Sequence, residues 1–213
     1  METVLHFDNG HGTRQYTPAS SGKKSPDGRI YEGEWNRAMV SRIVKAMRGL
    51  GYDCRQVVPE DTDVPLRERC ARVNEAIRRE PDKRHLFISV HINAAPLAAC
   101  DAQGWCDRAS GFEVYVSRSS SEESRKMALC MHETACEMGF KGNRAVPREG
   151  YWQADYRVLV STNCPAILTE NLFMTNHKEV DYLLSEEGQE AICNLHVAGL
   201  CKYLEHPASM IVQ

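Results

Sequence analysis

The ten residues HLFISVHINA, His85 to Ala94, form a nearly continuous apolar run that carries a histidine, His91, close to its end. A strand with this pattern is buried on both faces, as in a parallel sheet covered by helices. The chain before and after this run alternates between strand-like and helix-like segments. This alternation predicts an α/β fold: a single domain with a largely parallel, twisted sheet flanked by helices on both faces.

Short apolar or alternating runs that end at turn residues predict the other strands. These strands are expected at residues 2–7, 54–59, 111–117, 157–160 and 165–173. The polar stretch 13–33, rich in Gly, Ser and Lys, is predicted to be a loop.

Apolar residues recur at steps of three and four in two stretches, and this spacing predicts helices. The first stretch contains Trp35, Met39, Ile43, Met47 and Leu50, and the second contains Leu66, Cys70, Val73 and Ile77 with Asp61, Thr62 and Asp63 as candidate caps. A Ser-x-x-Glu capping box begins a third predicted helix over 119–139. Two closing helices are predicted at 176–186 and 188–205.

The composition limits the classes of function that the chain can have. The 213 residues are 42% hydrophobic and 26% charged, which suits one well-filled core, so one domain is expected over 1–213. A formal net charge of -3 gives no reason to expect a nucleic-acid partner. No apolar run approaches the roughly 18 residues of a membrane span. The opening METVLHFD lacks the features of a signal peptide, so synthesis in the cytoplasm is expected.

The nine cysteines are scattered and odd in number, and most lie in apolar stretches. A free thiol in such a stretch packs as a small hydrophobe. Cys100 and Cys106, which bracket the loop CDAQGWC, are the one pair that could form a disulfide, and reduced thiols are the favoured reading in a cytosolic protein.

Three predicted strands lead into chemically reactive side chains: His11, His91 and Glu170. Functional groups gather at the carboxyl ends of parallel strands, so these side chains would converge if their strands are neighbours. Glu34, at the start of the first predicted helix, would lie on the same side of the sheet. Two imidazoles and a carboxylate are a ligand set of catalytic zinc sites. Taken singly, His11 also fits a turn, Glu34 a helix start and His91 a buried position. Glu170 is harder to explain as structure, because a carboxylate beside an apolar strand loses hydration unless a partner pairs with it.

Several motifs make a family resemblance specific. They are DNGHG (8–12), Glu34-Trp35-Asn36, LRERCARVN (66–74), FISVHINA (87–94) and PAILTENLFMTN (165–176). In order and approximate spacing they resemble the zinc-dependent N-acetylmuramoyl-L-alanine amidases, the amidase-3 family of cell-wall hydrolases. The resemblance covers about residues 4–204. Asn9 replaces the family's usual proline and Val73 its usual alanine.

The resemblance implies one zinc ion bound by His11, Glu34 and His91, with Glu170 as the catalytic glutamate. Glu32 lies two residues before Glu34 and is the other candidate ligand, but the register of the family triplet favours Glu34. Glu170 would take a proton from the attacking water and deliver it to the leaving amine.

The implied substrate is the bond between N-acetylmuramic acid and the L-alanine of the peptidoglycan stem peptide. Arg148, Arg144 and Asn93 are candidate substrate-binding residues, and Arg14 is a further cation that could orient the carboxylates of the stem.

Other functions remain open at this point. A different zinc peptidase acting on stem peptides would use the same ligands, and an inactive relative could bind peptidoglycan without cutting it. We expect a monomer that is made in the cytoplasm and acts on the wall after release or export. A phage lysis enzyme released through a membrane pore fits this expectation, as does a trimmed or mis-started gene.

Overall fold

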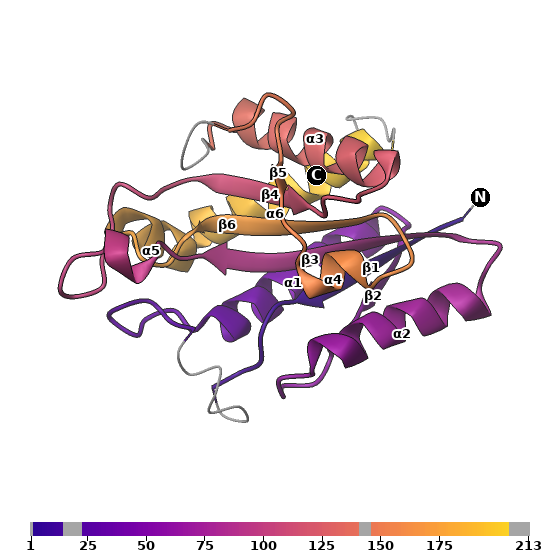
Figure 1. Cartoon of the computed structure of the whole chain (residues 1–213), viewed down its shortest axis with the longest axis horizontal. Coiled ribbons are helices and arrows are strands. Elements are labelled where there is room, and N and C mark those ends of the chain that lie inside the picture. The colour runs from indigo at the N-terminus through magenta and orange to yellow at the C-terminus, as the bar shows by residue number, and fades with distance from the viewer. Residues whose placement is uncertain (1, 15–22, 141–145, 205–213) are drawn as a thin grey trace.

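Six strands form one sheet in the order β2-β1-β3-β6-β4-β5 in this computed structural model, which describes residues 2–14, 23–140 and 146–204 (Figure 1). The strands are β1 (Thr3–Asn9), β2 (Asp53–Gln56), β3 (Arg84–Asn93), β4 (Phe112–Val116), β5 (Trp152–Gln153) and β6 (Ala166–Phe173). β2, β1, β3 and β6 are parallel to one another, whereas β4 runs antiparallel to β6. The predicted α/β fold with a largely parallel sheet is confirmed.

Helices cover both faces of this sheet. They are α1 (Glu32–Gly49), α2 (Leu66–Arg79), α3 (Glu122–Glu137), α4 (Arg157–Val160), α5 (His177–Leu184) and α6 (Glu186–Tyr203), with a short 3-10 turn at Leu97–Ala99. Side chains of α1, α3, α5 and α6 form the larger core with one face of the sheet. Side chains of α2 and α4 form a smaller core on the other face (Figure 1). The β3 strand lies between these two cores, because Ile88 faces the first and Phe87 the second.

Most of the predicted elements are present, with shifted ends. The exception is RVLV at 157–160, which was predicted as a strand and is wrong: it is the helix α4. Four residues, of which three are apolar, do not distinguish a strand from one helical turn, and here Val158 and Leu159 both pack into the smaller core. Residues 15–22 of the predicted loop 13–33 lie outside the described residues, and its C-terminal end comes early because α1 begins at Glu32.

The predicted caps of α2 are also wrong. Its N-cap is Pro65 with no side-chain hydrogen bond, and the carboxylate of Asp63 instead lies 3.2 Å from the guanidinium of Arg69. At α3 the cap is Ser121, whose hydroxyl accepts a hydrogen bond from the backbone of Ser124. A serine does initiate the helix, as predicted, although the glutamate of a capping box is not its partner.

All nine cysteines are free, including Cys100 and Cys106, so reduced thiols are the correct reading of that pair. In the part of the chain that is described, no helix is both long enough and apolar enough to cross a bilayer.

Candidate metal centre

Neighbouring strands bring the predicted reactive residues together. β3 lies between β1 and β6 in the sheet, so the carboxyl ends of these three parallel strands meet at one edge. His91 pairs in register with Glu170 of β6, and Glu170 pairs in turn with Glu113 of β4. His11 follows the end of β1. The condition set by the sequence, that the three strands are neighbours, is met.

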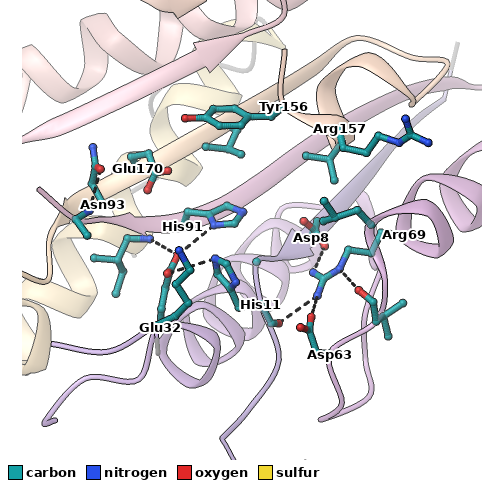
Figure 2. A pocket seen from close by; sticks show the side chains of 18 of the residues that line it. Asp8, His11, Glu32, Asp63, Arg69, His91, Asn93, Tyr156, Arg157 and Glu170 are labelled. Atoms are coloured by element: carbon teal, nitrogen blue, oxygen red, sulfur yellow. Dashed lines mark hydrogen bonds and ion pairs between the residues drawn. The ribbon is translucent and has the colours of Figure 1, made fainter. Parts of the chain in front are cut away.

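Three side chains converge at this edge: His11, Glu32 and His91. One donor atom from each lies within 4.8 Å of the others, and among the described residues this is the one group of three or more His, Cys, Asp or Glu side chains so arranged. The Nε2 atom of His11 is 3.3 Å from Oε2 of Glu32, and Nδ1 of His91 is 3.1 Å from Oε1 (Figure 2). The carboxylate therefore bridges the two imidazoles.

The glycines of DNGHG are required by close approaches at this centre. A Cβ atom on Gly10 would lie 2.0 Å from the ring of His91, and one on Gly12 would lie 2.5 Å from the backbone of Asp63. Gly33 in α1 is constrained in the same way, because its Cβ would lie 2.0 Å from the Gly12 carbonyl. The histidine thus stands between two glycines because a larger residue at position 10 would push the loop away from β3, and one at position 12 would push it away from the segment that precedes α2.

His11 itself has a positive φ of 65°, which is unusual for a residue with a side chain. Arg69 of α2 holds this loop. Its guanidinium donates to the carbonyl oxygens of Asn9 and His11 and pairs with Asp8 (Figure 2). Arg69 is 1% exposed, so these hydrogen bonds form away from competing water. We infer that they stabilise the strained backbone that directs His11 toward His91.

The structure places Glu32, not the predicted ligand Glu34, beside the two histidines. Glu34 pairs instead with Arg14, with 3.1 Å between Nε of Arg14 and Oε1 of Glu34. Two helical residues differ by about 200° around the axis, so these two glutamates lie on opposite faces of α1. Glu32, at 3% exposure, faces the sheet. Asn36, one turn later, donates to the carbonyl of Gly10 and lies on the same face.

The charges of the cluster suit a cation. Burial lowers the pKa of His11, which favours the neutral imidazole. Burial opposes ionisation of Glu32, but hydrogen bonding to His91 and the charges of both imidazoles outweigh it, and the pKa of Glu32 is lowered. Burial also lowers the pKa of His91, but the Glu32 carboxylate more than offsets this effect and the net shift is upward. A carboxylate and two imidazoles that converge in a buried site need a shared positive charge, which a divalent metal can supply.

Glu170 projects into the same cavity without contacting the cluster (Figure 2). Burial raises its pKa to about 8; the charge of His91 opposes this shift, whereas Glu32 and Glu113 add to it. Its Oε2 atom is buried and has no hydrogen-bond partner among the described protein atoms. A carboxyl group in this state is suited to exchange a proton with a bound molecule.

A cavity of about 560 Å³ joins these groups. Its lining also includes Lys23, Asn93, Tyr156 and Arg157, and Figure 2 shows the last two across the cavity from Glu32. Asn93, a predicted substrate-binding residue, does reach the cavity, where its side-chain amide donates to Glu113.

The predicted arginines do not line this cavity in the described structure. Arg148 is exposed and is absent from the lining, Arg14 pairs with Glu34, and Arg144 lies outside the described residues. Sequence reasoning missed Arg69, Lys23 and Arg157 as residues of the site, and it named Glu32 only as the second candidate ligand. Arg69 is the first residue of the Arg-x-x-x-Ala-Asn family motif that the chain resembles, so the sequence does contain a signal for it, but none marks Lys23 or Arg157.

Comparison with known proteins gives a consistent result. The sequence model of the N-acetylmuramoyl-L-alanine amidases (Amidase_3) matches residues 6–202. The endolysin of Bacillus phage SPP1 is 28% identical over 211 residues, which cover 96% of this chain and 67% of that protein. An uncharacterized protein of Bacillus subtilis strain 168, YqiI, is 24% identical, with 95% of this chain and 85% of that protein covered.

Solved structures share the fold. The N-acetylmuramoyl-L-alanine amidase from Clostridium difficile 630 matches with a TM-score of 0.75 and 22% identity, over 97% of this chain and 99% of that one. The catalytic domain of CwlV, an amidase from Bacillus (Paenibacillus) polymyxa, matches with a TM-score of 0.73 and 23% identity, over 96% and 99% of the two chains. At these identities the likeness shows a common fold.

Proposed function

The chain belongs to the N-acetylmuramoyl-L-alanine amidase family, and on that premise we propose that it uses one zinc ion to hydrolyse the amide between N-acetylmuramic acid and the L-alanine of the peptidoglycan stem peptide. The observation that carries this proposal is the convergence of His11, Glu32 and His91 within 4.8 Å, beside a half-buried glutamate, Glu170, that lines the same cavity. The chain acts in this proposal as a single catalytic domain on cell-wall peptidoglycan.

His11, Glu32 and His91 would hold the zinc ion, with one donor atom each. When bound, zinc acts as a Lewis acid that polarises the amide carbonyl and makes water a stronger acid. The Arg69 hydrogen bonds to the His11 loop and the Asn36 bond to Gly10 keep the ligands in place. These supporting contacts reduce the reorganisation that metal binding requires.

Glu170 acts as the general base and then as the general acid. Its carboxylate would accept a proton from the attacking water and later donate it to the nitrogen of the leaving L-alanine. Its pKa of about 8, raised by burial, makes the carboxylate of Glu170 a stronger base than that of an exposed glutamate. A divalent cation held by His11, Glu32 and His91 would lower that pKa toward neutrality, where the group can both accept and donate a proton.

Arg157 and Lys23 are proposed to orient the substrate. Both line the cavity, and stem peptides carry carboxylates that a guanidinium or an ammonium group can bind. We expect Arg157→Gln to lower kcat/KM on a soluble muropeptide by about tenfold, the loss of roughly one charge-assisted hydrogen bond. The loss should lie mainly in KM, because this residue contacts substrate away from the reacting atoms.

Arg148→Gln is the matched control, because Arg148 is exposed and absent from the lining of the cavity. Its kcat/KM should equal that of the wild type. Amidation of the stem carboxylates should reduce wild-type turnover as much as Arg157→Gln does, and should have little further effect on that variant. An Arg157→Gln protein with unchanged kinetics would remove this residue from substrate binding.

Mass spectrometry of the products from purified peptidoglycan tests the proposed cleavage. We expect free stem peptides that begin with L-alanine, together with glycan strands whose muramic acid has regained a free lactyl carboxylate. Pretreatment of the enzyme with a chelator should abolish these products, and added zinc should restore them. Peptides cut inside the stem, with the muramic acid amide intact, would instead indicate a zinc peptidase.

A further inference from the structure

A chain of buried hydrogen bonds runs from Arg69 to the far side of the His91 ring. Arg69 donates to Oδ1 of Asp8 at 2.7 Å, and the hydroxyl of Ser89 lies 2.6 Å from Oδ2 of the same carboxylate. The Nε2 atom of His91 lies 3.1 Å from that hydroxyl. Asp8 and Ser89 are register partners on β1 and β3 and are 1% and 0% exposed.

The direction of each bond in this chain follows from the groups involved. A guanidinium only donates, so Asp8 accepts from Arg69 as a carboxylate. The carboxylate also accepts at Oδ2, where the single hydrogen of the Ser89 hydroxyl must point. The Ser89 oxygen then has only lone pairs to offer His91, and Nε2 of His91 must carry the hydrogen.

The hydrogen on Nε2 decides which ring nitrogen of His91 can bind a metal ion. In a neutral imidazole with its hydrogen on Nε2, the other nitrogen, Nδ1, has a free lone pair. Nδ1 is the atom that faces Glu32 at 3.1 Å within the cluster. A proton on Nδ1 would occupy the same direction as a metal ion.

We propose that Ser89, held by Asp8, is a positioning residue that fixes the Nε2–H tautomer and the ring orientation of His91 and thereby raises the affinity of the site for zinc. The inference rests on the proposed zinc function. Partners of this kind behind a liganding histidine are typically worth 10- to 100-fold in metal affinity.

Two variants test the inference by different routes. Ser89→Ala removes the acceptor for Nε2–H. Asp8→Asn reverses the direction of the hydrogen bonds between position 8 and His91. The asparagine oxygen would accept from Arg69, so its NH₂ group would donate to the hydroxyl of Ser89. That hydroxyl would then donate its own hydrogen to Nε2 of His91. That reversal favours the Nδ1–H tautomer, which cannot bind the ion.

Ser124→Ala is the matched control. Ser124 is also a buried serine, 4% exposed, and its hydroxyl bonds to the backbone of Ala166 away from the cluster. Zinc dissociation constants are measured for all four proteins by competition with a chromophoric chelator. NMR of protein labelled with ¹⁵N in histidine reports the tautomer of His91 in each.

We expect wild type and Ser124→Ala to bind zinc equally, and Ser89→Ala and Asp8→Asn to bind about 10- to 100-fold more weakly. The metal-free Asp8→Asn protein should also lose the hydrogen on Nε2 of His91. If the wild type binds zinc but Ser89→Ala binds it as tightly, the positioning role is excluded while the proposed function stands. Equal weakening in Ser124→Ala would assign the effect to general destabilisation and overturn the inference. A wild type that binds no zinc would overturn both.

Discussion

Glu170→Gln is expected to lower kcat by about 10²- to 10⁴-fold while one zinc ion stays bound, because glutamine keeps the shape of glutamate but cannot carry the proton. Glu170 is suited to this role by its position: its Oε2 atom is buried, faces the cavity and has no hydrogen-bond partner among the described protein atoms. The change should lie in kcat rather than in KM, since the lost interaction belongs to the transition state. Turnover of a soluble muropeptide and metal analysis of the same preparation provide the measurement.

Glu113→Gln is the matched control for this prediction. Glu113 is a buried carboxylate next to Glu170 in the sheet, but its Oε2 is bonded to Asn93 and Tyr115. We expect this variant to keep zinc and most of its activity. Near-normal turnover in Glu170→Gln, or an equal loss in Glu113→Gln, would mean that Glu170 is not the general base.

The second large effect is a difference in zinc content between variants of Glu32 and of Glu34. Glu32 lies with the two histidines, whereas Glu34 pairs with Arg14. Glu32→Ala should leave the protein with almost no zinc after dialysis, because it removes the only negative charge among the three converging donors. Glu34→Ala should keep one zinc ion and lose only the ion pair with Arg14. Exposed pairs of this kind are worth at most about 1 kcal/mol, so its stability should change little.

Metal content by mass spectrometry and turnover of muropeptide distinguish the two variants. Circular dichroism of the metal-free proteins checks that both remain folded. Zinc retained by Glu32→Ala but lost by Glu34→Ala would reverse the assignment and restore the carboxylate that the family triplet favours.

The family triplet favours Glu34, whereas the structure places Glu32 with the two histidines, and the sequence itself contains a signal for this position. The apolar stripe of the first helix, Trp35, Met39, Ile43 and Met47, marks the face that packs on the sheet. Counting back seven residues from Met39 reaches Glu32, whereas Glu34 lies half a turn away. Helical periodicity therefore indicates that Glu32 faces the sheet beside the histidines, which the register of a short motif does not.

The prediction of a strand at 157–160 failed because the signal was too weak. Four residues carry no periodicity, and burial of Val158 and Leu159 is compatible with either structure. This error affected the site, because Arg157 begins the helix α4 and reaches the cavity from there. Placing that segment as a strand gave no reason to consider its arginine as a substrate-binding residue.

The sequence by itself determined the α/β class, the strand endings that carry His11, His91 and Glu170, and the family. These features are local: a strand or helix shows its period over a few residues, and glycines beside a histidine mark a tight turn.

Only the tertiary structure decided which carboxylate completes the cluster, which cations reach the cavity, and that a hydrogen-bonded chain of Arg69, Asp8 and Ser89 lies behind His91. These contacts join residues up to 81 positions apart, as between Asp8 and Ser89. The packing of strands and helices decides which of these residues meet. A hydrogen bond tolerates changes of only a few tenths of an ångström in the donor–acceptor distance, and no local sequence pattern encodes that distance.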